Sequence, residues 1–200
     1  MAVEGETDRL LVGDTLGFVS FLSKNGPWQK RVAAHNGAVV GVHFAPREGW
    51  ISVGEDCRIH LGTKRVLTIC KGLDAVYPVS SDLSYDGEQL LIGLCNGLIL
   101  AKSTASGKEK ALHRGFAIEV KGACFLEKYV MAFGDMNQAH LWSPFSSFPI
   151  ETLDILPARV YDELFPDGDG RVLLATRDTA WPQRCAFAFS DLWVVIASLK

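Results

Sequence analysis

Five histidines are the side chains in this sequence whose charge changes most readily near neutral pH. His35 and His113 lie between strand-like runs, whereas His43, His60 and His140 lie within them. A catalytic base or a metal ligand needs convergent partners, and the sequence identifies none for these residues. We therefore expect a hydrogen bond to a neighbouring turn for the first two, and packing or surface positions for the other three.

Other reactive patterns are equally incomplete. Residues 167–170 read Asp-Gly-Asp-Gly, which resembles the start of a calcium loop, but Asp178 stands where an EF-hand needs glutamate. Gly93 and Gly97 lack the Gly-Lys-Ser/Thr of a phosphate loop, and no Gly-x-Ser-x-Gly elbow occurs. Cys57 precedes an arginine that could lower its pKa, although an ordinary turn cysteine is favoured. We expect no catalytic residue, no cofactor and no metal.

Charge and cysteine content restrict the cellular setting. The net charge of −3 and pI near 5.9 argue against nucleic acid or an anionic membrane as the main partner. The five cysteines form no Cys-x-x-Cys pair, which is typical of reduced thiols in the cytoplasm. The longest apolar stretch, residues 192–199, is far shorter than the roughly 20 residues that span a bilayer. We expect a cytoplasmic protein without membrane insertion.

A strand-like run ends at a small residue about every forty residues. The series is Gly13, Gly54, Gly93, Gly134 and Thr176, with steps of 41, 39, 41 and 42 residues. Each member follows an apolar run, and turn signals separate further runs within each unit. A period of 40 to 45 residues with several strands per unit is typical of propeller blades. No sustained helical period occurs.

These observations predict an all-β fold of about four to five blades, each with four antiparallel strands. We expect an N-terminal tail over residues 1–8 and a propeller over residues 9–200. The expected blades span residues 9–35, 36–72, 73–115, 116–157 and 158–200. Three forms stay open: a small closed ring, an excerpt of a longer propeller, and a propeller completed by another chain. The second and third are favoured, because the first unit lacks its innermost strand in this interpretation and open end blades expose apolar faces.

The units resemble WD repeats. Ala34-His35 and Leu112-His113 resemble the opening Gly-His dipeptide, and His140-Leu141-Trp142 resembles the closing segment. The family has an internal network of histidine, hydroxyl, aspartate and tryptophan side chains. The resemblance implies a structural blade network of His35, Ser52, Asp56, His113 and Trp142.

Within that class, the tryptophan-poor units are similar to the echinoderm microtubule-associated protein-like family. The similarity is carried by residues 9–13, Arg-Leu-Leu-Val-Gly, and residues 89–97, Gln-Leu-Leu-Ile-Gly-Leu-Cys-Asn-Gly. This family binds tubulin through tandem propellers. The resemblance implies tubulin or other cytoskeletal components as partners, and a location at the cytoskeleton or cilium.

Two groups of side chains are candidates for binding a partner. A local positive charge lies at the outer part of the third unit, where it would suit an acidic surface or would protect a solvated edge strand. Two tryptophans stand out in the apolar C-terminal part of the chain. The candidate residues are Lys102, Lys108, Lys110, Arg114, Trp181 and Trp193.

Rigid blades with variable connecting loops favour a non-catalytic scaffold that binds other proteins in a multiprotein assembly. Two alternatives stay open. One is a propeller enzyme with a site at the channel mouth, and the other is a structural subunit whose open edge is completed by a partner chain.

Overall fold

A computed structural model describes residues 2–3, 9–23, 30–69, 75–117, 119–126, 129–134 and 138–154. It also describes the backbone of residues 160–166, 171–176, 184–189 and 192–198, and the backbone alone of residues 3, 153 and 154. The described residues form strands and the connections between them, and they contain no helix.

In this part of the chain the strands form five sheets of four. The first contains β1 (Ala2–Val3), β2 (Arg9–Gly13), β3 (Phe18–Ser23) and β4 (Lys30–Ala33). The second contains β5 (Val39–Ala45), β6 (Gly49–Gly54), β7 (Arg58–Leu61) and β8 (Arg65–Thr68). The third contains β9 (Pro78–Leu83), β10 (Gln89–Leu94), β11 (Ile99–Ser103) and β12 (Glu109–His113). The fourth contains β13 (Val120–Phe125), β14 (Val130–Gly134), β15 (Gln138–Trp142) and β16 (Glu151–Asp154). The fifth contains β17 (Val160–Pro166), β18 (Arg171–Thr176), β19 (Arg184–Phe189) and β20 (Leu192–Ser198).

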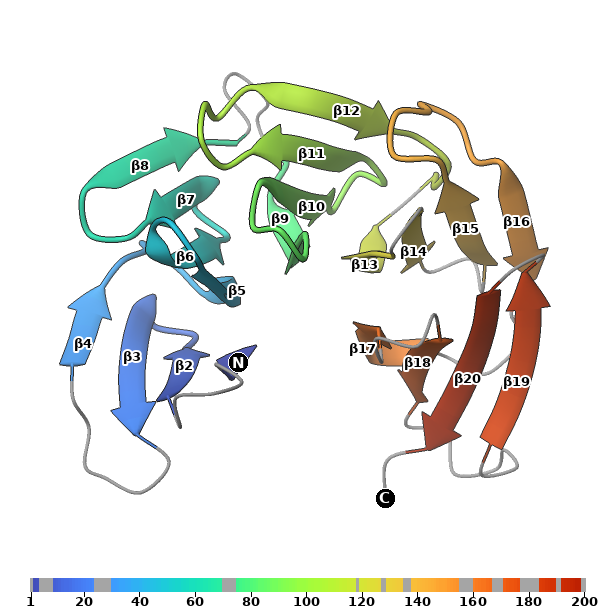
Figure 1. Ribbon diagram of the computed structural model, residues 1–200, viewed down its shortest axis with the longest axis horizontal. Helices are drawn as coiled ribbons and strands as arrows, with labels where there is room; N and C mark the ends of the chain where they lie inside the picture. The colour runs from blue at the N-terminus through green and yellow to red at the C-terminus, as the bar shows by residue number, and fades with distance from the viewer. Residues whose placement is uncertain are drawn as a thin grey trace.

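The first four sheets are antiparallel meanders, in which each strand pairs with the next along the chain. Several of their turns are closed by a carboxylate that accepts the amide two residues further on, as Asp14, Asp56 and Asp86 do. Figure 1 shows the sheets fanning around a common centre, with β1, β5, β9, β13 and β17 innermost. The sheets form an open arc, with the first sheet at one end and the fifth sheet at the other. The chain is therefore all-β, with successive sheets arranged like blades.

The fifth sheet departs from the expected antiparallel order. Its strands follow the order β17-β18-β20-β19, and β20 runs parallel to β18. The sequence of β20, Leu-Trp-Val-Val-Ile-Ala-Ser, is apolar on both faces, whereas β19 begins with an arginine. The five residues of β19 that follow the arginine are also apolar, so the inner position of β20 is set by its parallel pairing with β18 and not by apolar content alone.

The N-terminus also differs from the expectation of a tail over residues 1–8. Ala2 and Val3 form β1, which pairs with Leu11 and Leu10 of β2. Ala2 packs against the cluster that contains Leu11 and Val42. Backbone pairing and this apolar contact give the first sheet the innermost strand that the sequence did not reveal.

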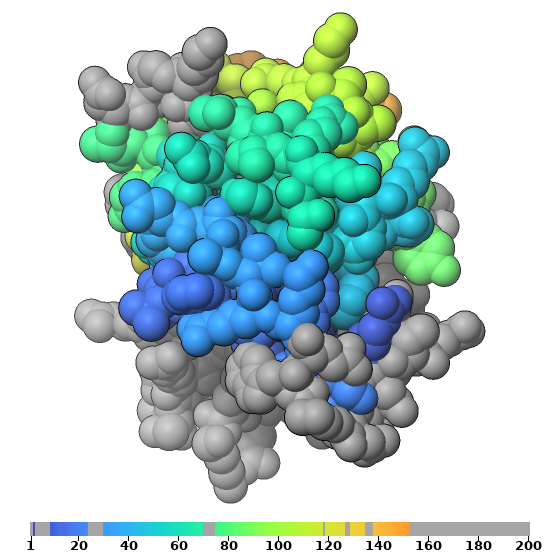
Figure 2. All heavy atoms as spheres, turned by 90° about the vertical axis from the view of Figure 1, so that its left-hand side faces the viewer, coloured from blue at the N-terminus to red at the C-terminus, as the bar shows by residue number. Residues whose placement is uncertain are grey.

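Apolar clusters lie between consecutive sheets rather than within them. Leu90 and Ile92 of β10 pack toward the second sheet, whereas Leu91 packs toward the fourth, as strand alternation requires. Each such fully buried side chain contributes about 1.5–3 kcal/mol of stability. Figure 2 shows the outer edges of the first three sheets (blue, cyan and green) in direct contact. The first four sheets therefore pack against one another in a stack.

Candidate functional site

A buried hydrogen-bonded chain joins His35, Ser52 and Asp56 in the second sheet. His35 Nδ1 lies 2.9 Å from Asp56 Oδ1, and His35 Nε2 lies 2.8 Å from Ser52 Oγ. A carboxylate only accepts, so Nδ1 donates to Asp56, and in the neutral ring Nε2 accepts the Ser52 hydroxyl. Asp56 also accepts the amides of Asn36, at 3.0 Å, and Arg58, at 3.2 Å. Burial raises the pKa of Asp56, but these hydrogen bonds outweigh burial and hold it below its usual value.

Hydrolase triads have the same hydrogen-bonded arrangement of carboxylate, imidazole and hydroxyl. Here, however, a substrate cannot reach the hydroxyl of Ser52. Ser52 is 0% exposed, and the His35 side chain is 0% exposed as well. A nucleophile must meet its substrate, which these positions do not allow. A Cβ atom at Gly54 would overlap the His35 imidazole, so the histidine is also closely packed. The three side chains therefore fasten the segment that enters the second sheet to its second strand.

The fourth sheet repeats the second sheet in register. Ser52 of β6 lies opposite His60 of β7, and Ala132 of β14 lies opposite His140 of β15. The two sheets thus have equivalent positions, except that the fourth sheet carries a methyl group where the second carries a hydroxyl.

Phe116 occupies the place in the fourth sheet that His35 occupies in the second. The His35 ring lies edge-on to His60, with centroids 4.8 Å apart, and the Phe116 ring lies edge-on to His140, with centroids 4.4 Å apart. Phe116 packs against the apolar cluster that contains Ala132. Without a hydroxyl to bond, an aromatic ring fills this position better than an imidazole would.

His113, which the WD-repeat resemblance assigns to the blade network, has a different contact. It is 0% exposed, and its Nδ1 donates to the Ser146 carbonyl over 2.6 Å. Trp142 is fully buried and donates from Nε1 to the Arg114 carbonyl over 3.2 Å. Burial lowers the pKa of His113, and the hydrogen bond to the Ser146 carbonyl raises it by a smaller amount. His113 therefore anchors residues 143–150, which we call the 143–150 connection. The related signal in the sequence is Ala132 in the position of Ser52, which indicates a missing hydroxyl but does not locate Phe116.

Polar bonds also link neighbouring sheets through the innermost strands. His43 Nε2 lies 2.9 Å from Ser81 Oγ, which joins the second and third sheets. Asp82 accepts the Phe125 amide over 2.7 Å, which joins the third and fourth. Burial lowers the pKa of His43 to about 4 and raises the pKa of Asp82 to about 6. Both groups are thus displaced from their usual titration ranges toward the neutral form.

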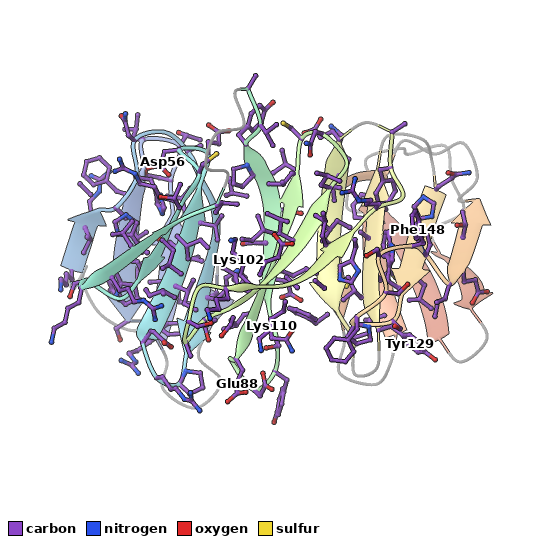
Figure 3. The ribbon with its side chains drawn as sticks, turned by 90° about the horizontal axis from the view of Figure 1, so that it is seen from above. Asp56, Glu88, Lys102, Lys110, Tyr129 and Phe148 are labelled. Carbon is purple, nitrogen blue, oxygen red and sulfur yellow. The ribbon has the colours of Figure 1, made fainter. Side chains whose placement is uncertain are left out.

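Four basic residues lie on the outer part of the third sheet. Lys108, Lys110 and Arg114 are exposed, and Lys102 is half-buried. None of the four forms an ion pair with another residue in the described ranges. Figure 3 places Lys102 and Lys110 between the rim that carries Asp56 and the opposite rim that carries Glu88. These side chains therefore give the outer part of the third sheet a local positive charge that the described residues do not neutralise.

A surface hollow of about 310 Å³ lies beside Lys110. Phe145 of the 143–150 connection forms part of its wall and is 79% exposed. Arg47 and Glu88, which also line it, form an ion pair of 3.0 Å. Phe148 and Ile150 of the same connection are 69% and 55% exposed. The sequence did not single out these apolar side chains, because single exposed apolar residues are common on surfaces.

The remaining candidates are placed only in part. Trp181, Asp178 and residues 167–170 lie outside the described residues, and Trp193 is described by its backbone in β20. Cys57 is half-buried, packs against the cluster between the second and third sheets, and donates its thiol to the Val76 carbonyl over 3.0 Å. Among the described residues, no group of three or more His, Cys, Asp or Glu could hold a metal ion. Nor does the described chain contain a helix long and apolar enough to cross a membrane.

Comparison with known proteins gives no family for this chain. No model of a protein family matches it, and no curated protein sequence matches it. The WD-repeat and microtubule-associated resemblances therefore stay predictions that rest on the residues quoted for them.

Proposed function

We propose that this chain is a non-catalytic scaffold that binds other proteins in a multiprotein assembly, built on WD-repeat-like propeller blades. One observation carries the proposal. Of seven large apolar side chains exposed among the described residues, six lie in connections and only Val66 lies in a strand. The six are Leu16, Tyr77, Tyr85, Phe145, Phe148 and Ile150. Apolar side chains presented on the loops of a rigid stack suit protein recognition, because little conformational freedom is lost on binding.

The proposal is tested with the purified chain as bait in quantitative affinity capture from cytosol. We expect saturable capture of defined proteins, and reduced capture when Leu16, Tyr77 and Tyr85 are changed together to serine. A matched bait with Lys64, Thr63 and Thr68 changed to alanine controls for surface substitution, since these exposed residues carry no large apolar group. Capture that is non-saturable, or equal for both variants, would contradict the proposal.

A cytoskeletal setting is the finer form of this proposal. It is supported by the family resemblance and by the basic cluster, because tubulin carries acidic tails. The test is co-sedimentation with microtubules at low and moderate salt. Binding that decreases with salt and with Lys108→Glu agrees with this form. If the chain stays in the supernatant at low salt, the cytoskeletal form is wrong while the scaffold itself stays testable.

Completion of the arc by further blades is a second candidate role, favoured by the outward face of the first sheet. Leu11 faces the second sheet, so alternation turns its neighbours Leu10 and Val12 the other way, with Leu22 beside Leu10. All three are half-buried apolar side chains on a face that no described sheet covers. Further blades of a longer gene product or of another chain would cover this face. Sedimentation velocity of the unchanged chain and of Leu10→Asp tests this role, because the variant should self-associate or bind a partner less. The role is contradicted if the unchanged chain is a stable monomer and Leu10→Asp does not alter its solubility.

A further inference from the structure

We propose that the hollow between Lys110 and Phe145 binds an acidic, extended segment of a protein partner. A carboxylate of that segment meets the Lys110 ammonium, and an adjacent apolar side chain packs on the Phe145 ring. The inference deepens the proposed scaffold function by naming one surface and the chemistry of its ligand.

The exposed aromatic side chain is held in place by its own loop. The Ser146 carbonyl accepts from His113 over 2.6 Å, and the Ser147 carbonyl accepts from the Arg114 amide over 2.8 Å. The Ile150 amide donates to the Leu141 carbonyl over 2.7 Å. Hydrogen bonds therefore fasten both the middle and the end of the connection to neighbouring strands. A fixed loop that still leaves its apolar side chains in water is already arranged for a partner.

The charges around the hollow select the sign of the partner. Arg47 is neutralised by Glu88, at 3.0 Å, so this ion pair adds no net charge to the wall. Lys110 has no ion pair among the described residues, and Lys108 lies two positions away with its own unpaired charge. The Arg65 guanidinium donates to the carbonyls of Thr104 and Ala105, so a third cation lies beside the wall of the hollow. A carboxylate is therefore attracted to this side of the hollow.

The size of the hollow limits the ligand to a segment. A volume of about 310 Å³ is at the lower end of the range for binding pockets, and it accommodates one or two side chains. Its wall is mixed, because Phe145 is apolar whereas Ser103, Gln89 and Lys110 are polar. Such a wall fits a carboxylate next to an apolar group better than a uniformly charged or uniformly apolar ligand.

The experiment uses a displayed library of short random peptides selected on the intact chain. We expect the recovered peptides to combine Asp or Glu with an aromatic or aliphatic residue. In fluorescence anisotropy, Lys110→Glu should weaken a recovered peptide about tenfold or more, and Phe145→Ala should weaken it by a similar factor. Two matched controls, Lys64→Glu and Val66→Ala, make the same kinds of change on exposed residues that do not line the hollow, and they should leave the affinity unchanged.

Two outcomes would overturn the inference. In one, the recovered peptides lack the acidic and apolar pair, or they bind Lys110→Glu as tightly as the unchanged chain. In the other, the chain forms a dimer in sedimentation that Phe145→Ala dissociates, which would make a second copy the occupant. A double variant that combines Lys110→Glu with Phe145→Ala separates this inference from the scaffold function. If it still captures cytosolic partners saturably, the hollow is not the binding surface, but the scaffold function stands.

Discussion

The Phe116 ring lies edge-on to the His140 ring, with centroids 4.4 Å apart and ring planes at 72°. In the second sheet the equivalent contact is made by His35 and His60, at 4.8 Å and 74°. The neighbouring strand position is a serine in the polar version and Ala132 in the apolar one. Each sheet thus uses a matched pair, in which an imidazole accompanies a hydroxyl or a phenyl ring accompanies a methyl group. A mixed pair would bury an unsatisfied polar group.

This relationship predicts a double-mutant cycle in the second sheet. Ser52→Ala removes the partner of His35 Nε2 in a fully buried position and should lower the free energy of unfolding by about 1–3 kcal/mol. His35→Phe should cost less stability in the Ser52→Ala background than in the unchanged chain, because Nε2 has already lost its partner there, whereas the loss of the donor to Asp56 is common to both. Urea denaturation of the two single variants and the double variant measures the coupling. Strict additivity of the two changes would show that the pair is not matched.

Strand positions could be predicted from the sequence, because turn residues and alternation act locally. The apolar run before Gly54 became β6, and the run before Gly134 became β14. The place of Phe116 could not be found in this way. His35 and His113 are 78 residues apart, whereas Ser52 and Ala132, which are equivalent in register, are 80 apart. Phe116, the structural equivalent of His35, follows it by 81 residues, so the histidine motif at His113 falls three residues short of the equivalent position and identifies the wrong residue.

The order of the fifth sheet depends on contacts between distant residues. The sequence indicates two apolar strands at its C-terminal end, and the structure contains both, as β19 and β20. Which of them pairs with β18 is decided by competition for the covered position in the sheet. Local propensity favours a strand for both and does not rank them, so the parallel pairing could not be deduced.

Asp82 predicts a loss of stability as the pH rises. Burial raises its pKa from 3.8 to about 6, so the folded state holds a proton that the unfolded state releases between these values. Stability is therefore lost as the pH rises from 3.8 to about 6, and above that range the ionised carboxylate destabilises the fold by a constant amount. Asp82→Asn keeps an acceptor for the Phe125 amide and removes the charge. We expect this variant to be more stable than the unchanged chain by roughly 1–3 kcal/mol at pH 7 and equal to it near pH 3.5, by urea denaturation. A constant difference across this range would contradict the assignment.

His43 predicts the opposite slope. Burial lowers its pKa from 6.5 to about 4, so the unfolded state takes up a proton before the folded state does as the pH falls. Its contribution to stability is therefore lost between pH 6.5 and pH 4. The substitution His43→Gln keeps a polar group beside Ser81 but removes the group that titrates. The variant should lose less stability than the unchanged chain on acidification from pH 7 to pH 4.5, and urea midpoints at the two pH values give the comparison. A parallel loss in both proteins would show that His43 is not the responsible group.

His113 is expected to control the order of the 143–150 connection. His113→Phe keeps a ring beside Trp142, whose centroid is 5.8 Å from the imidazole, but it removes the hydrogen bond to the Ser146 carbonyl. The loss of roughly 0.5–1.5 kcal/mol should open the connection locally more than it destabilises the whole fold. The Ile150 amide and the Arg114 amide, which bond across this connection, should then exchange hydrogen about two- to tenfold faster. His60→Phe is the matched control, because the Nε2 atom of His60, like that of His113, has no hydrogen bond, but His60 lies in the second sheet. If both variants changed exchange at Ile150 equally, the effect would be global and His113 would not be the anchor. If only His113→Phe changed it, the same variant should also weaken acidic peptides at Phe145, because a loosened loop must be ordered again on binding.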